Sequence, residues 1–175
     1  MEQVRVLLVS GSTRPGSSNT RALQALHGRV WPGVTAVLYE SLRDLPDFVP
    51  GTDPQPRAVR DLLDRIASAD AVLSSTPEYA GGLPGSLKNL LDWKVGGGQL
   101  SGEPVAWLDV ANPGPGGGAH AQLRTVLGHV GARVLARVHL TLASDPGDAA
   151  AVAVHDAQLV TAMAETATAI RKEVT

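Results

Sequence analysis

The chain has 175 residues, of which 43% are hydrophobic and 18% are charged, and this composition is typical of one folded domain over residues 1–175. A net charge of -2 and 3% aromatic residues argue against nucleic acid as a partner, because nucleic-acid binding usually needs a basic face. The chain contains no cysteine, which excludes disulfides, thiol catalysis and cysteine metal sites and fits the cytoplasm. No apolar run is long enough to span a membrane, so we expect no membrane partner and no signal peptide.

Hydrophobic periodicity predicts strands and helices that alternate along the whole chain. The expected strands are residues 4–9, 34–39, 71–75 and 104–110, with a fifth within 133–142. The expected helices are residues 19–30, 57–69, one that begins at 83, 119–130 and one within 152–172. Ser18 or Asn19 is the expected N-cap of the first helix. This alternation is typical of an α/β fold, in which helices cover both faces of a parallel sheet.

Three unusual loops follow the first, third and fourth expected strands. Ligands of open α/β sheets bind beyond the carboxyl ends of the strands, at the point where the strand order reverses. If the three loops share one ligand, their strands must be neighbours in the sheet. The order 2-1-3-4-5 achieves this, whereas the order 3-2-1-4-5 would place the second strand between the third and the first. We therefore expect a five-stranded parallel sheet of order 2-1-3-4-5.

The first of these loops, residues 11–20, is rich in hydrogen-bond donors. Hydroxyl side chains stand at Ser12, Thr13, Ser17, Ser18 and Thr20, and Arg14 adds a positive charge. Together with the start of a helix, these groups would neutralise and bind a terminal phosphate. Neither G-x-G-x-x-G nor the G-K-[ST] end of a P-loop is present. The alternative is an ordinary strand-to-helix loop with a helix cap.

The other two loops are rich in glycine and proline. Residues 76–85 contain two prolines and three glycines, which would let the backbone approach a flat ligand, although a structural turn explains them equally well. Glu78 has no second carboxylate or histidine in its motif, so an acid–base role is not favoured. The backbone N–H groups of residues 112–118 could face carbonyl oxygens or an anionic ring, and the alternative here is a flexible connection. The histidines form no cluster, so no metal site is expected.

The motifs in these loops resemble those of the NADPH-dependent FMN reductase family, which has a flavodoxin-like fold. The pattern G-S-x-R-x-x-S-x-N at residues 11–19 is similar to the phosphate loop of that family. Residues 77–79 with 82–89, 92 and 93 are similar to its second signature, and residues 114, 117, 118 and 121–124 to its third. The resemblance runs over residues 4 to 135 in the same order, and it implies a three-layer sandwich with bound FMN.

The resemblance also implies roles for individual residues. The FMN phosphate would contact Ser12, Arg14, Ser17 and Asn19, with Ser18 and Thr20 nearby. Pro77, Glu78 and Tyr79 would flank the flavin ring mainly through the backbone, next to Ala80 and Gly81. The pyrimidine edge of the ring would meet Asn112, Pro113, Gly114, Gly117 and Gly118. No residue is expected to be catalytic, because the chemistry belongs to the flavin.

The implied activity is an FMN-dependent oxidoreductase in which NAD(P)H reduces the flavin and leaves before a flavin, quinone, azo compound or similar acceptor takes the electrons. The alternative is a flavodoxin-like electron carrier or a flavin-binding module without catalysis. The sequence departs from the family at two positions. Ala80 stands where Asn is common, which bears on substrate preference, and Ala111 begins a loop that usually begins with serine, so hydroxyl side-chain contacts there would be lost while backbone contacts could remain. The family also implies a homodimer or a dimer of dimers, in which Trp93 or residues 94–103 could shape the pocket of a neighbouring subunit.

Overall fold

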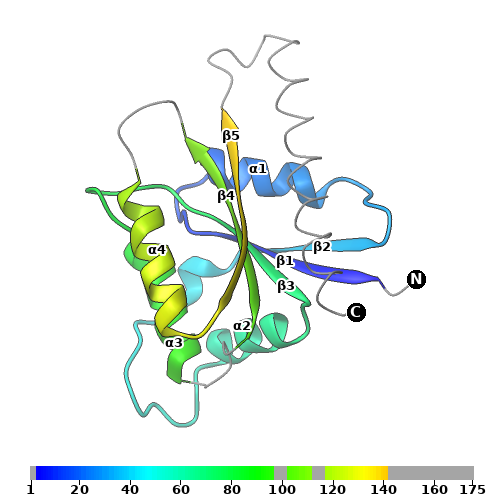
Figure 1. Ribbon diagram of the computed structural model, residues 1–175. Coiled ribbons are helices and arrows are strands. Elements are labelled where there is room, and N and C mark those ends of the chain that lie inside the picture. The colour runs from blue at the N-terminus through cyan, green and yellow to red at the C-terminus, as the bar shows by residue number, and fades with distance from the viewer. Residues whose placement is uncertain (1–2, 97–101, 112–116, 142–175) are drawn as a thin grey trace.

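The computed structural model describes residues 3–96, 102–111 and 117–141. Five strands in these residues form one parallel sheet of order β2-β1-β3-β4-β5 (Figure 1). They are β1 (Val4–Ser10), β2 (Val34–Tyr39), β3 (Ala71–Ser75), β4 (Pro104–Ala111) and β5 (Arg133–Thr141). The strand order expected from the three loops is therefore confirmed, and so is the flavodoxin-like fold class.

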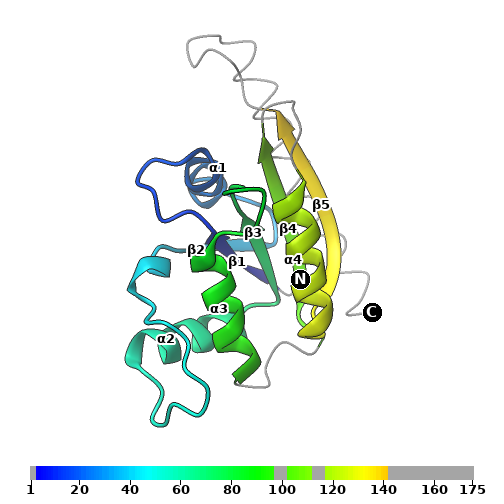
Figure 2. The ribbon, with the colours of Figure 1, turned by 90° about the vertical axis from the view of Figure 1, so that its left-hand side faces the viewer.

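Helices cover both faces of this sheet. Helix α1 (Ser18–His27) packs on one face, whereas α2 (Arg57–Ala67), α3 (Gly85–Gly96) and α4 (Gly118–His129) pack on the other (Figures 1 and 2). Alternate residues of β1 serve the two faces: Val6 and Leu8 contact the α1 side, while Leu7 and Val9 contact the other. Since both faces are buried, the central strands read as continuous apolar runs in the sequence.

The strand register brings the ends of β1 and β3 level with each other. Ser10 of β1 pairs with Ser75 of β3, so the loops that follow these two strands begin side by side. Ser75 also pairs with Leu108 of β4, and β4 continues from there to Ala111. This register places the starts of the first and second loops at one edge of the sheet, which is the arrangement that a shared ligand requires.

Helix α1 differs from its prediction at both ends. Its N-cap is Ser17, whose side chain accepts a hydrogen bond from the N–H of Thr20, so the expectation of Ser18 or Asn19 was wrong. The helix ends at His27 because Gly28 caps it, three residues before the expected end. Val30, expected on its buried face, is 97% exposed. An apolar residue beyond the cap extended the helical pattern in the sequence without belonging to the helix.

Helix α3 continues into the segment expected to be a glycine-rich connection. Trp93 is buried, donates to the carbonyl of Pro46 at 2.8 Å and meets Phe48 edge to face, so it lies inside its own subunit and does not reach a neighbour's pocket. Lys94 is also almost fully buried, and burial lowers the pKa of its amine although the nearby Glu103 carboxylate raises it. The helix expected within residues 152–172 lies outside the described residues.

A short 3-10 helix, η1 (Leu42–Asp44), follows β2 within the long proline-rich loop and contacts α3. Within the described part of the chain, no helix has both the length and the apolar character needed to cross a bilayer.

Candidate functional site

The first and second loops are in direct contact. Gly11 donates its N–H to the carbonyl of Ser75 at 2.7 Å, and its own carbonyl accepts from the Ser86 hydroxyl at 3.2 Å. A Cβ atom at position 11 would lie 2.5 Å from the Thr76 hydroxyl oxygen, so only glycine fits there. The close approach fixes the start of the 11–17 loop against the start of the loop that connects β3 to α3.

The second loop is joined in turn to the N-terminus of α4. One carboxylate oxygen of Glu78 accepts hydrogen bonds from the N–H groups of Gly117 and Ala119, at 2.9 and 3.0 Å. A Cβ atom at Gly118 would lie 1.9 Å from the carbonyl oxygen of Gly81, which shows how tightly the two segments fit. Two hydrogen bonds and a close backbone contact therefore join the second loop to the start of α4.

Gln122, one turn further along α4, adds a second tie to this loop. Its side-chain oxygen accepts from the N–H of Leu83 at 2.7 Å, and it lies close enough to Gly82 that a Cβ there would approach within 2.9 Å. Gln122 lies in the third motif, where it was not expected to contact the second.

The hydrogen bonds that Glu78 accepts lower the pKa of its carboxyl group. The N–H of Ala119 and then the N–H of Gly117 stabilise the charged carboxylate, so the pKa of Glu78 lies below its ordinary value of 4.5. The positive end of α4 favours an anion at the same place. Glu78 is thus an ionised cap of α4, and its geometry does not make it a proton donor.

The tip of the second loop is a tight reversal of the chain. Tyr79 and Gly82 exchange two backbone hydrogen bonds of 3.0 and 2.9 Å, and the residues between them have positive φ angles, +50° at Ala80 and +74° at Gly81. These are the angles of a type I′ turn, which favours Asn and Gly. Ala80 therefore adopts a backbone conformation that costs an alanine energy. The turn leaves the Tyr79 side chain 50% exposed.

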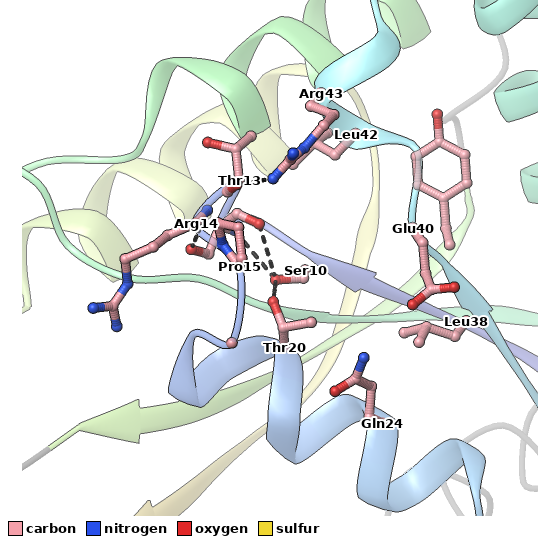
Figure 3. Close-up of a pocket in the computed structure, with 13 residues that line it drawn as sticks. Ser10, Thr13, Arg14, Pro15, Thr20, Gln24, Leu38, Glu40, Leu42 and Arg43 are labelled. Carbon is pink, nitrogen blue, oxygen red and sulfur yellow. Dashed lines mark hydrogen bonds between the residues drawn. The ribbon is translucent and has the colours of Figure 1, made fainter.

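Hydroxyl groups organise the first loop from within. The Thr20 hydroxyl lies 2.8 Å from the hydroxyls of both Ser10 and Ser17, and Ser12 accepts from the N–H of Arg14 at 3.3 Å. These side chains hold the loop in shape. The Arg14 side chain extends outward from the loop (Figure 3).

The start of α1 offers unpaired backbone donors. Its first turn contains no acidic residue. Ser18 and Asn19 occupy the first two helical positions, where backbone N–H groups have no acceptor within the helix. These two N–H groups and the helix dipole create a site for an anion at the end of β1.

Asn19 has a structural partner that its motif did not indicate. Its side chain is buried, and its amide oxygen lies 2.8 Å from the hydroxyl of Ser75, which is also 2.9 Å from the carbonyl of Leu108. The start of α1 is thereby tied to the ends of β3 and β4. Two consecutive serines at the end of an apolar strand, Ser74 and Ser75, were the only sequence sign of this link.

A histidine–carboxylate pair also lies near the site and was missed in the sequence. Asp109 of β4 and His120 of α4 approach to 3.5 Å, and both side chains are largely buried. The His120 ring is parallel to Trp107, with ring centroids 6.3 Å apart. Asp109 was detectable as the one charged residue in an otherwise apolar expected strand, residues 104–110.

The structure brings most of the candidate residues to one edge of the sheet. Those of the first loop and α1 are Ser12, Arg14, Ser17, Ser18, Asn19 and Thr20; those of the second loop are Pro77, Glu78, Tyr79, Ala80 and Gly81; and Gly117 and Gly118 begin α4. Asn112, Pro113 and Gly114 lie outside the described residues.

Comparison with known proteins agrees with this geometry. The model of the family described as NADPH-dependent FMN reductase matches residues 4–147. The chain belongs to this family. The family expected from the three motifs is thus confirmed, and with it the cofactors FMN and NAD(P)H.

Individual relatives are similar over most of the chain. An NAD(P)H-dependent FMN reductase of Pseudomonas aeruginosa is 38% identical over 127 residues, which are 69% of this chain and 66% of that protein. A quinone reductase of Escherichia coli K12 is 32% identical over 141 residues, which are 77% of this chain and 74% of that protein. Among solved structures, the flavoenzyme NAD(P)H:(acceptor) oxidoreductase FerB of Paracoccus denitrificans has a TM-score of 0.68 and 30% identity, with 97% of this chain and 98% of FerB covered.

Proposed function

We propose that this chain is an FMN-dependent NAD(P)H oxidoreductase that reduces a small flat acceptor such as a flavin, a quinone or an azo compound in a ping-pong reaction. The proposal rests on one observation: contacts of Gly11, Glu78 and Gly118 hold the first loop, the second loop and the start of α4 together at one edge of the sheet. Family membership supports the same activity.

The first loop would hold the FMN phosphate. The N–H groups of Ser18 and Asn19 and the positive end of α1 supply donors for an anion. Arg14 extends from the loop and would add a charge-assisted hydrogen bond to the phosphate. The hydroxyls of Ser12, Ser17 and Thr20 would orient the loop and are close enough to contribute further donors.

The flavin ring would lie against the second loop and the N-terminus of α4. A Cβ at Gly81 would meet nothing within 4 Å, so this glycine and the turn at residues 79–82 leave backbone surface free of side chains where a ring could pack. The half-exposed Tyr79 would cover one edge of the ring. The start of α4 would place its positive end near the pyrimidine edge, where preorganised N–H donors favour negative charge.

When bound, FMN supplies the hydride and electron chemistry. The residues of the chain bind it, orient it and keep its site in shape. The Glu78 carboxylate is ionised and accepts two hydrogen bonds from the start of α4, so it is not a mobile proton donor. This agrees with a protein that binds the cofactor and leaves the chemistry to it.

The second loop is the part of the site that would select the electron acceptor. Ala80 presents no polar group at the tip of the turn, and Tyr79 presents an aromatic face. Such a surface favours flat, weakly polar acceptors over charged ones. Quinones fit this description, and one relative is named a quinone reductase.

An electron carrier is the competing function, and the two make different predictions. Carriers dock partners through strongly charged faces, whereas this chain has a net charge of only -2. In the test, the purified FMN-loaded protein is mixed with NADH or NADPH and a quinone. Steady nucleotide oxidation without any partner enzyme supports the reductase, and its absence with full FMN occupancy supports the carrier.

We further propose a homodimer or a dimer of dimers that works in the cytoplasm, where NAD(P)H is supplied. Sedimentation of the FMN-loaded protein measures the assembly directly, and a monomer at micromolar concentration would contradict it.

A further inference from the structure

A cavity of about 360 Å³ lies on the side of the first loop that faces β2 (Figure 3). Its described lining comes from β1, the first loop, α1, the end of β2 and the start of η1. Ser12, Arg14 and Thr20 belong both to this lining and to the proposed phosphate loop. The flavin ring would lie where β3 and β4 end, and β1 separates β2 from β3 in the sheet, so the β2 side of the cavity is distinct from the ring site.

The positive charges near this cavity are directed elsewhere. The Arg14 side chain points outward, and the Arg43 guanidinium donates to the carbonyl of Thr13 (Figure 3). The hydroxyls of Ser10 and Thr20 are bonded to each other at 2.8 Å. Neither arginine is therefore directed at the β2 side of the cavity, where Glu40 lies.

The β2 side of the cavity combines polar groups with apolar surface. The Glu40 carboxylate faces the cavity from just after β2 and the Gln24 amide from α1, with Leu38 between them (Figure 3). Leu42 adds apolar surface from η1. A carboxylate beside apolar walls fits a neutral ligand that has hydroxyl donors at one end and a flat apolar ring at the other.

The position of Glu40 narrows the ligand further. Glu40 directly follows Tyr39, the last residue of β2, and β2 pairs with β1. In dinucleotide-binding sheets, an acidic residue of this kind accepts hydrogen bonds from the ribose diol. The volume lies near the lower end of the range of about 300–1,000 Å³ for small-molecule pockets, which suits a nucleoside.

We propose that this cavity binds a ribonucleoside with free 2′- and 3′-hydroxyls, and that Glu40 is the acceptor for this diol. Adenosine is the probe, because it occurs both as a free nucleoside and as one end of NADH. Binding of the adenosine end of NADH rests on the proposed function. A 2′-phosphate, as in NADPH, would place negative charge against Glu40, so the cavity discriminates against it.

The first experiment measures binding by calorimetry in buffer saturated with FMN. We expect adenosine to bind, 2′-deoxyadenosine to bind about tenfold more weakly, and adenosine 2′-monophosphate to bind more weakly than adenosine. Glu40→Gln should lower the adenosine affinity about tenfold. Asp64→Asn, which removes an exposed carboxylate from α2, is the matched control and should leave it unchanged. No adenosine binding at millimolar concentration, equal binding of the deoxy compound, or equal affinities of the two variants would overturn the inference.

A second experiment identifies the source of the nucleoside. If the cavity holds the adenosine end of NADH, adenosine raises the KM for NADH without changing kcat, and Glu40→Gln removes this inhibition. If adenosine binds with the expected selectivity but does not inhibit, the cavity serves a free nucleoside. Flavin absorbance and quinone turnover are recorded on the same samples. Adenosine binding without any turnover would overturn only the proposed function, and turnover without adenosine binding would overturn only this inference.

Discussion

Glu78 in the loop after β3 accepts a 3.0 Å hydrogen bond from the backbone N–H of Ala119 in the first turn of α4. With the matching bond from Gly117, one carboxylate joins two loops that are 39 residues apart in sequence. The depressed pKa of Glu78 makes this link dependent on pH.

Acid should weaken the link between the loops. A carboxylate whose folded pKa is lowered stabilises the fold above its unfolded pKa, and it loses this contribution as the pH falls through the folded pKa. We expect the free energy of unfolding of the wild type to decrease as the pH falls below about 4.5. Glu78→Gln should be less stable than the wild type at pH 7, and its free energy of unfolding should decrease less in acid. Urea unfolding at pH 7, 5, 4 and 3 measures both. Parallel pH curves for the two proteins would show that Glu78 does not cap α4.

Gly118→Ala should separate the second loop from α4. The new Cβ would overlap the carbonyl oxygen of Gly81, which is backbone and cannot rotate away. We expect a loss of about 1–3 kcal/mol in the free energy of unfolding, together with weaker FMN binding. Gly128→Ala near the other end of α4 is the control, because its Cβ meets nothing within 4 Å. That change should instead stabilise by about 0.4–1 kcal/mol, and similar effects of the two changes would contradict the close approach.

Ala80→Gly should stabilise the protein. Residue 80 has a φ of +50°, which glycine adopts without the steric cost that alanine bears. We expect a gain of about 0.5–1 kcal/mol in thermal or urea unfolding, after subtracting the larger entropy of glycine in the unfolded chain. In contrast, Ala25→Gly inside α1 should cost about 1 kcal/mol. Destabilisation by both changes would mean that residue 80 is not in the left-handed region.

Arg14→Ala should weaken FMN binding while leaving the apoprotein as stable as wild type. Loss of a charge-assisted hydrogen bond to phosphate corresponds to about 1.5–3 kcal/mol, or roughly a 10- to 150-fold higher Kd. Fluorescence titration of the apoprotein with FMN gives the value. Arg57→Ala, which removes an exposed charge on α2, is the control. An unchanged Kd for Arg14→Ala would remove Arg14 from the phosphate site.

Asn19→Ala should behave differently from Arg14→Ala. Asn19 is buried and bonded to Ser75, so its removal leaves a buried hydroxyl without one of its partners. The Ser75 hydroxyl keeps the carbonyl of Leu108 as an acceptor, so we expect the apoprotein to lose about 0.5–1.5 kcal/mol of stability, measured by urea unfolding without FMN. Undiminished stability of the apoprotein would indicate that Asn19 serves the cofactor alone.

Much of the fold could be predicted because the sheet is buried on both faces. β2 and β3 were predicted to the residue, and β1 and β4 to within one residue at an end, since each is an apolar run that ends at polar residues. The end of α1 was missed because Val30 continues the apolar period beyond the Gly28 cap. A helix cap depends on local backbone geometry, and the spacing of apolar residues does not indicate where that geometry changes.

The contacts that build the site were harder to predict. Three contacts join separate elements: Glu78 with Ala119, Asn19 with Ser75, and Asp109 with His120. In the sequence, each of these residues can be explained by its own segment alone, so nothing indicates its distant partner. The positive φ of Ala80 was hidden for a different reason, because alanine is not a usual residue of a type I′ turn. The loops themselves were found because their glycines, prolines and hydroxyls are local signals.

Electron transfer from NAD(P)H through FMN bound at the three joined segments is tested most directly by anaerobic rapid mixing. The FMN-loaded protein is mixed with one equivalent of NADH or NADPH, and a quinone is added in a second step. We expect the visible flavin absorbance to bleach before any acceptor is present and to return when the quinone is added, as a ping-pong reaction requires. Flavin absorbance that stays unchanged with both nucleotides, in protein shown to hold FMN, would contradict the proposed function.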